Sequence, residues 1–260
     1  MSILVLRMTP YGILMGGDRN ITAQKTLQDG KVVITLQGQS QRPKVLKWPN
    51  REVIVGYVGQ ARFDGEAADQ WLYSFIGRNL EFDSLESVAK SLQAGLSKLF
   101  ARGDFDDASI LHLAGFEQVN KEWTPRIFFL RNTVAIKGDG TYEIGNGYDL
   151  SEEIADPKYF AGKTGSEIRE FLAKGFFSFR QGYDLAAFNI IDQSLREAVV
   201  GIVAGHPQQP IKVPVSLDEW AKHVAFSIHA YGAYFAAFYP AFEQYVGGGA
   251  DVVSAAWPRV

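Results

Sequence analysis

The sequence predicts a single α+β domain in which two mostly antiparallel sheets pack between layers of helices. Short apolar segments separated by turn residues dominate the first sixty residues, two helical patterns follow, and strands, helices and a closing strand complete the chain. Sheets and helices that each present one apolar face bury it best by stacking in layers. The chain has 260 residues, 47% of them hydrophobic, which is enough for one large core, so we expect residues 1–260 to form one domain.

Composition excludes several classes of function. The chain has no cysteine, which rules out disulfides, thiolate zinc sites and a cysteine nucleophile. A net charge of −3 without a run of basic residues argues against nucleic-acid binding. The four histidines lack metal-ligand spacing, and we expect neither a metal nor a cofactor. No apolar segment reaches the roughly 20 residues of a membrane span, and the N-terminus lacks a signal-peptide layout, so we expect a soluble cytoplasmic protein.

The first predicted elements are strands. The segments Ser2–Met8 and Ile13–Met15 are apolar and flank Thr9-Pro10-Tyr11-Gly12, a sequence typical of a tight turn, so they predict a buried hairpin. Further short strands are predicted at Lys31–Gln37, Pro43–Trp48 and Arg51–Val58.

Two helices are predicted next. In Asp64–Ile76 the apolar residues recur at helical spacing, with Trp71, Leu72 and Phe75 on one face. The second helix covers Ser84–Leu99, and Ser84 is well suited to cap its start.

The middle of the chain returns to strands, at Ile110–Gly115 and Arg126–Arg131, which a polar loop joins. The turn Gly138-Asp139-Gly140 predicts a hairpin between the flanking apolar segments, after which we expect Gly145-Asn146-Gly147 to leave the sheet.

Helices and one strand complete the prediction. Ser166–Phe179 and Leu185–Val203 have helical patterns, and Ser216 begins a long helix in which Glu219 completes a capping-box pattern. The apolar segment Ala250–Trp257 is the expected closing strand.

The segment Gly12–Thr22 carries the main functional signal. Asp18 ends the second predicted strand and lies 16 positions after Ser2, and Thr22 follows shortly afterwards. This arrangement resembles the opening of proteasome β-type subunits and of the bacterial protease HslV, which are N-terminal nucleophile (Ntn) hydrolases. The resemblance implies a four-layer αββα sandwich, with Ser2 as the nucleophile once Met1 is removed and Asp18 as its acidic partner. It also implies that Thr22 lies near the substrate backbone.

A second segment carries the same resemblance. Arg42–Trp48 followed by Val53–Ala61 is similar to the lysine strand and the glycine-containing strand of that family. By this resemblance Lys44 is the catalytic lysine and Gly59 supplies an oxyanion-hole N–H. Lys47 is an alternative to Lys44, but the odd spacing places the two on opposite faces of a strand, so only one can point into the site, and we favour Lys44.

The remaining site residues are implied by the resemblance alone. Asn146 stands where the family has a supporting serine, and the family's supporting aspartate falls at Glu243 or Gln244. Val246 or Gly247 replaces a further serine. The family's substrate pocket corresponds to Ile21, Leu46, Tyr57 and Ala61, which would accept a modest apolar side chain. Relative to the family, the chain has an expected helical insertion at about residues 150–215, before the last long helix.

An N-terminal serine can act as its own catalytic unit. A serine hydroxyl needs an adjacent base, and a free α-amine, with a pKa of about 7.7–8, is partly neutral at physiological pH. A charged Lys44 nearby would disfavour a second positive charge and keep the amine neutral. These features predict an amide- or peptide-bond hydrolase.

Two other functions compete with this hypothesis. A non-catalytic subunit that keeps the fold for assembly or binding is the first, and an Ntn amidase for small amides is the second. The resemblance implies a homo-oligomer, with a ring as one arrangement, and an ATP-dependent unfoldase as one conceivable partner. An aromatic stripe that begins at Tyr231 either packs on the domain itself or forms a contact between subunits.

Overall fold

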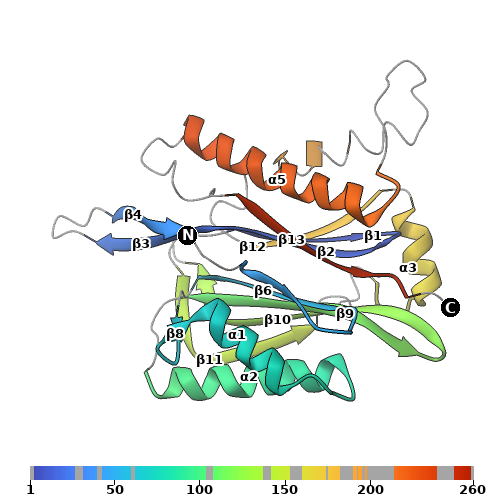
Figure 1. Cartoon of the computed structure of the whole chain (residues 1–260), viewed down its shortest axis with the longest axis horizontal. Coiled ribbons are helices and arrows are strands. Elements are labelled where there is room, and N and C mark those ends of the chain that lie inside the picture. The colour runs from blue at the N-terminus through green and yellow to red at the C-terminus, as the bar shows by residue number, and fades with distance from the viewer. Residues whose placement is uncertain are drawn as a thin grey trace.

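A computed structural model describes residues 3–26, 32–39, 43–59, 62–103, 108–136, 142–152, 160–173, 175–181, 190–191, 193–194, 197, 214–238 and 249–258. Over these ranges the chain is a mixed α and β structure with antiparallel sheets and four helices (Figure 1). The expected combination of helices with antiparallel sheets is confirmed at this level.

The first sheet has the strand order β12-β1-β2-β13. Its strands are β1 (Leu4–Thr9), β2 (Gly12–Asp18), β12 (Phe177–Gln181) and β13 (Ala250–Ala256). The predicted hairpin is present as β1 and β2, and β13 pairs with β2 so that Ala250 lies opposite Asp18. The N-terminal hairpin is therefore flanked on both sides by strands from the last third of the chain.

Strand β12 corrects one sequence prediction. The helix expected over Ser166–Phe179 ends early, because α3 covers only Gly165–Leu172 and a strand follows. Phe177 and Phe179 pack against the apolar cluster between the two sheets, with their ring centroids 4.9 Å apart. Antiparallel pairing with β1 thus overrides the helical pattern of the sequence.

The second sheet has the order β11-β10-β9-β6-β5. Its strands are β5 (Val45–Lys47), β6 (Val53–Gly59), β9 (Ser109–Val119), β10 (Glu122–Ile136) and β11 (Tyr142–Glu152). Asn120 and Lys121 both have positive φ and form a two-residue turn between β9 and β10, where the sequence suggested a longer polar loop. Both strands are therefore longer than predicted.

Strand β11 spans Gly145-Asn146-Gly147, but these residues have no pairing partner on β10. The pairing stops at Ile144, opposite Thr133, and resumes at Asp149, opposite Arg131, so the segment leaves the ladder locally and the strand then returns to it. The register shifts twice between Arg131 and Ala135, so local irregularity of the ladder accommodates the glycine-rich segment.

Two helices pack on the second sheet. Helix α1 spans Ala68–Arg78 and begins later than expected, because Asp64 and Gly65 have φ values of 53° and 75° and form the turn between two short strands. These strands are β7 (Arg62–Phe63) and β8 (Glu66–Ala67). Helix α2 spans Leu85–Ala101, and Ser84 caps it through a reciprocal hydrogen-bond pair with Ser87, as the sequence predicts.

Helix α5 (Leu217–Phe238) packs on the first sheet. The Glu219 backbone N–H donates to the Ser216 hydroxyl at 3.3 Å, which confirms the predicted cap. The Glu219 carboxylate, however, accepts from the N–H of Val215 at 2.7 Å rather than from that of Ser216. Among the helices that can be described, none is long and apolar enough to span a membrane.

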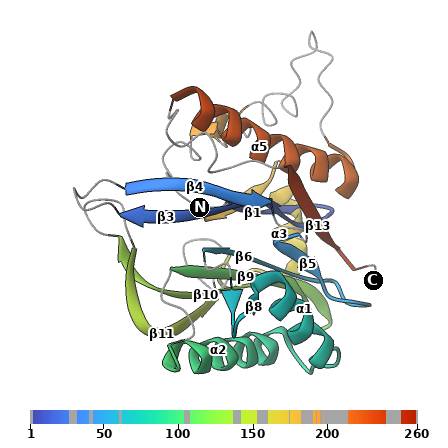
Figure 2. The same ribbon diagram turned by 60° about the vertical axis from the view of Figure 1, so that its left-hand side comes forward.

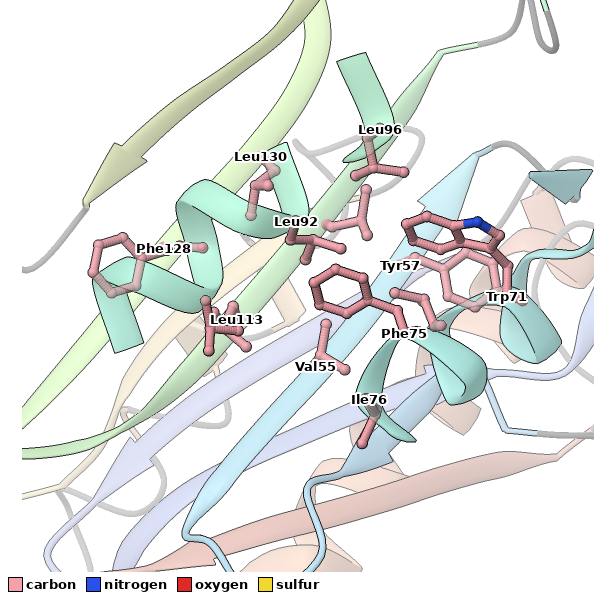
Figure 3. Packing of buried hydrophobic residues seen from close by; sticks show 14 of the residues in the cluster. Val55, Tyr57, Trp71, Phe75, Ile76, Leu92, Leu96, Leu113, Phe128 and Leu130 are labelled. Atoms are coloured by element: carbon pink, nitrogen blue, oxygen red, sulfur yellow. The ribbon is translucent and has the colours of Figure 1, made fainter. Parts of the chain in front are cut away.

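The elements are arranged in layers. Helix α5 lies outside the first sheet, that sheet faces the second sheet, and α1 and α2 cover the other face of the second sheet (Figures 1 and 2). Three apolar clusters fill the spaces between the layers. The cluster under α1 and α2 includes Trp71, Phe75 and Leu92, whose side chains lie side by side against the sheet (Figure 3).

Two glycines set the spacing of these layers. A Cβ at Gly16 would lie 2.6 Å from a methyl group of Val224 on α5. A Cβ at Gly56 would lie 2.5 Å from the sulfur of Met15 and 2.7 Å from Leu4. Both distances are shorter than van der Waals contact, so a side chain at either glycine would force the facing side chains or the layers to shift.

A two-stranded sheet, β3 (Asn20–Thr26) and β4 (Val32–Gln39), extends from the end of β2 away from the layers (Figures 1 and 2). The sequence predicted the second of these strands but not the first. The Gly138-Asp139-Gly140 turn lies outside the described residues. The same is true of most of the expected helix Leu185–Val203, in which the five described residues are helical.

Candidate functional site

Asp18 ends β2 with its side chain fully buried. Its Oδ1 atom accepts the backbone N–H of Ile3 at 2.9 Å, and its Oδ2 atom accepts the N–H of Asn20 at 3.2 Å. A buried carboxylate needs such donors because it has lost its water. The two bonds join the start of the first strand to the turn that follows the second.

Lys44 completes the cluster from the second sheet. It lies directly before β5 and is 4% exposed. Its Nζ atom donates to Asp18 Oδ1 at 3.2 Å and to the carbonyl oxygen of Asn20 at 2.5 Å. Lys47 instead lies on the surface, where it pairs with Glu52 at 3.1 Å, so Lys44 is the lysine that meets Asp18.

Burial shifts the pKa of both charged groups of this pair. It raises the pKa of Asp18 above its ordinary value, and the positive charge of Lys44 and the Ile3 N–H oppose the increase. Burial also lowers the pKa of Lys44 below its ordinary value, and the charge of Asp18 opposes the decrease. Lys44 is therefore a lysine whose proton is less firmly held than usual, a property typical of functional sites.

Ser2 lies outside the described residues. The N–H of Ile3 that Asp18 accepts belongs to the peptide bond that joins Ser2 to Ile3. The pair of Asp18 and Lys44 is thus fixed to the backbone one residue from the expected nucleophile.

Gly59 ends β6 opposite Ser109 and has a φ of 95°. A Cβ at this position would lie 1.9 Å from the carbonyl oxygen of Ala108, so both the conformation and the space require glycine. The residue is exposed, and it lies on the strand next to β5.

The other expected site residues do not join the cluster of Asp18 and Lys44 within the described part of the chain. Tyr57 and Leu46 pack with the apolar cluster under α1 and α2, and burial raises the pKa of the Tyr57 hydroxyl. Asn146 is exposed on β11, at the opposite edge of the sheet from β5. Ile21 and Thr22 lie on β3, where only the backbone is described. Ala61, Glu243 and Gln244 lie outside the described residues.

Sequence reasoning missed two parts of the site. The first is Asn20, which is 5% exposed and binds both partners of the central pair through its backbone. The second is an ion pair between Arg19 and Asp251, which bridges β2 and β13. Arg19 could have been noticed for its place beside Asp18, but nothing in the sequence links it to Asp251. No group of side chains suited to a metal ion occurs within the described ranges.

The fold of this chain is similar to that of a proteasome-like protein. One similar solved structure is Anbu (ancestral beta-subunit) from Yersinia bercovieri, with a TM-score of 0.52 and 15% sequence identity over 98% of this chain and 81% of that chain. Another is a Gly-1 mutant of Anbu from Hyphomicrobium sp. strain MC1, with a TM-score of 0.46 and 13% identity over the same shares. The sequence matches no family model, and no curated protein sequence is similar to it.

These comparisons correct the assignment to the proteasome β-subunit and HslV family. The solved structure from Yersinia bercovieri that resembles this chain is an Anbu protein, which is proteasome-like but belongs to a distinct family. At 15% identity the likeness to the Yersinia protein establishes the fold and not the chemistry.

Proposed function

We propose that this protein is an amide- or peptide-bond hydrolase whose nucleophile is Ser2, exposed by removal of Met1. The observation that carries the proposal is the double use of Asp18 Oδ1, which accepts the Ile3 N–H at 2.9 Å and Lys44 Nζ at 3.2 Å. A buried ion pair has a high desolvation cost, which the hydrogen bonds of Asp18 and Lys44 to the backbone of Ile3 and Asn20 help to offset. Here Asp18, one member of the pair, accepts a hydrogen bond from the N–H of Ile3, the residue that follows Ser2.

We further propose that the layered structure is the four-layer αββα sandwich of Ntn hydrolases. Two facing sheets with α5 on one side and α1 and α2 on the other support this class. In this proposal, β1 begins two residues after the nucleophile and β2 carries the acidic residue, so the hairpin predicted from sequence is the scaffold of the site.

The proposed reaction uses few groups. The hydroxyl oxygen of Ser2 attacks the substrate carbonyl, and the α-amine of Ser2 takes the hydroxyl proton and gives it to the leaving amine as the C–N bond breaks. A water molecule, deprotonated by the same amine, then cleaves the ester bond to Ser2 and releases the acid. Lys44 disfavours protonation of that amine and Asp18 holds Lys44 in place. The N–H of Gly59 stabilises the oxyanion, a contribution of roughly 3–4 kcal/mol for one such donor.

The first test is the state of the N-terminus and the activity that depends on it. We expect the intact mass of the purified protein to lack Met1, and the protein to cleave members of a panel of fluorogenic peptide amides and small amides. Ser2→Ala should abolish cleavage with folding unchanged. Lys44→Met should also abolish it, whereas Lys47→Met, which alters the exposed pair with Glu52, should not. An unchanged rate in Ser2→Ala would overturn the proposal.

The same panel separates peptide hydrolysis from amidase activity on small amides. Cleavage confined to peptides longer than a few residues would favour a peptidase. Cleavage of small amides alone would assign the amidase reaction.

A non-catalytic role in assembly or binding is the alternative. The exposed position of Asn146 at the far edge of the second sheet favours it, because this residue does not reinforce the central pair. Retained Met1 and no cleavage of any substrate would establish the alternative, since the amine of Ser2 would then be part of a peptide bond.

We also propose that the protein forms a homo-oligomer, with a ring as one arrangement, and that it is cytoplasmic. The description of Anbu as a beta-subunit supports the oligomer, and the absence of cysteine suits a reducing compartment. Light scattering at tens of micromolar protein should give a mass well above 28.8 kDa, the mass of one chain. An ATP-dependent unfoldase is a partner only if folded substrates are cleaved more slowly than unfolded ones.

A further inference from the structure

A second charge pair lies beside the buried one. Arg19 follows Asp18 directly, and its guanidinium donates two hydrogen bonds to the carboxylate of Asp251, one of them from Nε to Oδ2 at 2.7 Å. The side chain of Asp251 is 15% exposed and that of Arg19 is 42% exposed. The pair thus connects the end of β2 to the start of β13 at the margin of the site.

The register of the sheet shows which way Asp251 faces. Asp251 lies directly opposite Gly17, and residues directly opposite in an antiparallel pair share a face of the sheet. A Cβ at Gly17 would lie 3.5 Å from Cβ of Lys44. Val253 and Ala255, which follow Asp251 at alternate positions, pack in the cluster between the sheets. The Asp251 carboxylate therefore belongs to the face that meets Lys44.

We propose that Asp251 is a positioning residue for the site: held by Arg19, its carboxylate faces Lys44 from β13 and keeps this lysine charged and directed at Asp18. The inference rests on the proposed function, in which a charged Lys44 keeps the nucleophile's amine neutral. With Asp251, strand β13 also contributes a residue to the site, in addition to Asp18 from β2 and Lys44, which directly precedes β5.

The charges around Lys44 support this role. Burial lowers the pKa of Lys44, and Asp251 acts with Asp18 to raise it. Within the described residues, Asp18 and Asp251 are the two carboxylates whose negative charge raises the pKa of Lys44. Arg19 contributes indirectly, because it forms an ion pair with Asp251. Because Arg19 points its guanidinium at Asp251, the carboxylate is held in one orientation in spite of its position near solvent.

A titration of Lys44 in the full chain tests the proposal without depending on activity. NMR of lysine labelled with ¹³C at Cε would follow the pKa of Lys44, with its signal assigned by its loss in Lys44→Met. We expect Asp251→Asn to lower this pKa by roughly 0.5–1 unit, as the loss of one nearby carboxylate predicts. The matched control is Asp149→Asn, which removes an exposed carboxylate from β11 and should leave the pKa of Lys44 unchanged.

A double variant guards against a folding defect. Arg19→Gln with Asp251→Asn replaces the ion pair by two neutral amides of similar shape, and the pKa of Lys44 should fall in the same direction by a smaller amount. If wild-type protein hydrolyses amides, Asp251→Asn should lower kcat several-fold, shift the pH profile and leave KM unchanged. An unchanged Lys44 pKa in folded Asp251→Asn and in the double variant would overturn the proposal. Failure of the proposed function would instead appear as a wild-type protein without activity but with a shifted titration in Asp251→Asn.

Discussion

Arg7 and His223 meet between β1 and α5, with the Arg7 Nη1 atom 2.6 Å from Nδ1 of the imidazole. Arg7 is fully buried, and its guanidinium also donates to Ser178 and Ser227 and lies 4.2 Å from the ring centre of Phe176. Because an arginine can only donate, Nδ1 of His223 must accept, which places the ring proton on Nε2. One side chain of β1 thus forms hydrogen bonds with Ser178 on β12 and with His223 and Ser227 on α5.

Replacing Arg7 should therefore loosen the outer helix. Arg7→Met keeps much of the side-chain length but leaves the buried hydroxyls and Nδ1 without their donor, which should cost roughly 2–4 kcal/mol of unfolding free energy. Urea denaturation followed by circular dichroism would measure it. Arg102→Met, which removes an exposed pair with Asp64, is the control and should cost less than about 1 kcal/mol. Equal effects of the two substitutions would contradict this role.

His112 predicts a specific dependence of stability on pH. It is fully buried on β9, its ring centre lies 4.1 Å from that of Phe129, and neither ring nitrogen has a hydrogen-bond partner among the described residues. Burial lowers its pKa to about 3. The pKa of the folded state is thus below the unfolded value of 6.5, so this contribution to stability is complete above pH 6.5 and is lost as pH falls toward 3.

The loss between pH 7.5 and pH 5.0 should be about 2 kcal/mol, at roughly 1.4 kcal/mol for each unit below 6.5. His112→Leu should lack this part of the pH dependence, and a comparison of urea unfolding of the two proteins at both pH values would isolate it. If both proteins lose the same free energy over this range, His112 is not the group responsible.

Gly56 should not tolerate even alanine. The added methyl group would meet Met15 at 2.5 Å and Leu4 at 2.7 Å, so the two sheets would have to separate, at a cost of roughly 1–3 kcal/mol. Gly77→Ala in α1 is the matched control, because no atom lies within 4 Å of the new Cβ, and it should stabilise by about 0.5–1 kcal/mol. Thermal unfolding of the two variants should move in opposite directions, and a neutral Gly56→Ala would show that the sheets are less closely packed than described.

Gly59→Ala should damage the site more than the fold. A positive φ and the Ala108 carbonyl oxygen both oppose a side chain here, so the end of β6 must shift, at a cost of about 1–3 kcal/mol. If Gly59 supplies the oxyanion donor, cleavage should fall about 100-fold or more in protein that is still folded at the assay temperature. An alanine variant with full activity would remove Gly59 from the proposed mechanism.

The sequence predicted those parts of the fold in which the local signal is strong. The β1–β2 hairpin combines two apolar strands with a Pro-Tyr-Gly turn, and α2 has both a regular apolar stripe and a capping serine. The meeting of Asp18 with Lys44 was reached through family resemblance, although the family assignment itself was too specific. The alternation of side chains along a strand indicated that only one of Lys44 and Lys47 can face the site, and the family resemblance favoured Lys44.

The missed features depend on contacts between distant segments. Phe177 and Phe179 fit a helical pattern equally well until β1 is available as a pairing partner. The link from Arg19 to Asp251 joins residues 232 positions apart, and neither residue type by itself indicates a partner. The turn at Asn120 and Lys121 was missed because lysine is uncommon with a positive φ.

The origin of the first sheet has a consequence for synthesis on the ribosome. Strands β1 and β2 leave the ribosome first, but the strands on both of their edges come from the last third of the chain. Until β12 and β13 have been synthesised, both edges of the hairpin are therefore unpaired, and each can pair with a strand of another nascent chain. The second sheet has no such delay, because β5, β6, β9, β10 and β11 follow one another along the sequence. The half of the molecule that carries Asp18 is thus assembled last, and the edges of its N-terminal hairpin stay unpaired for longest.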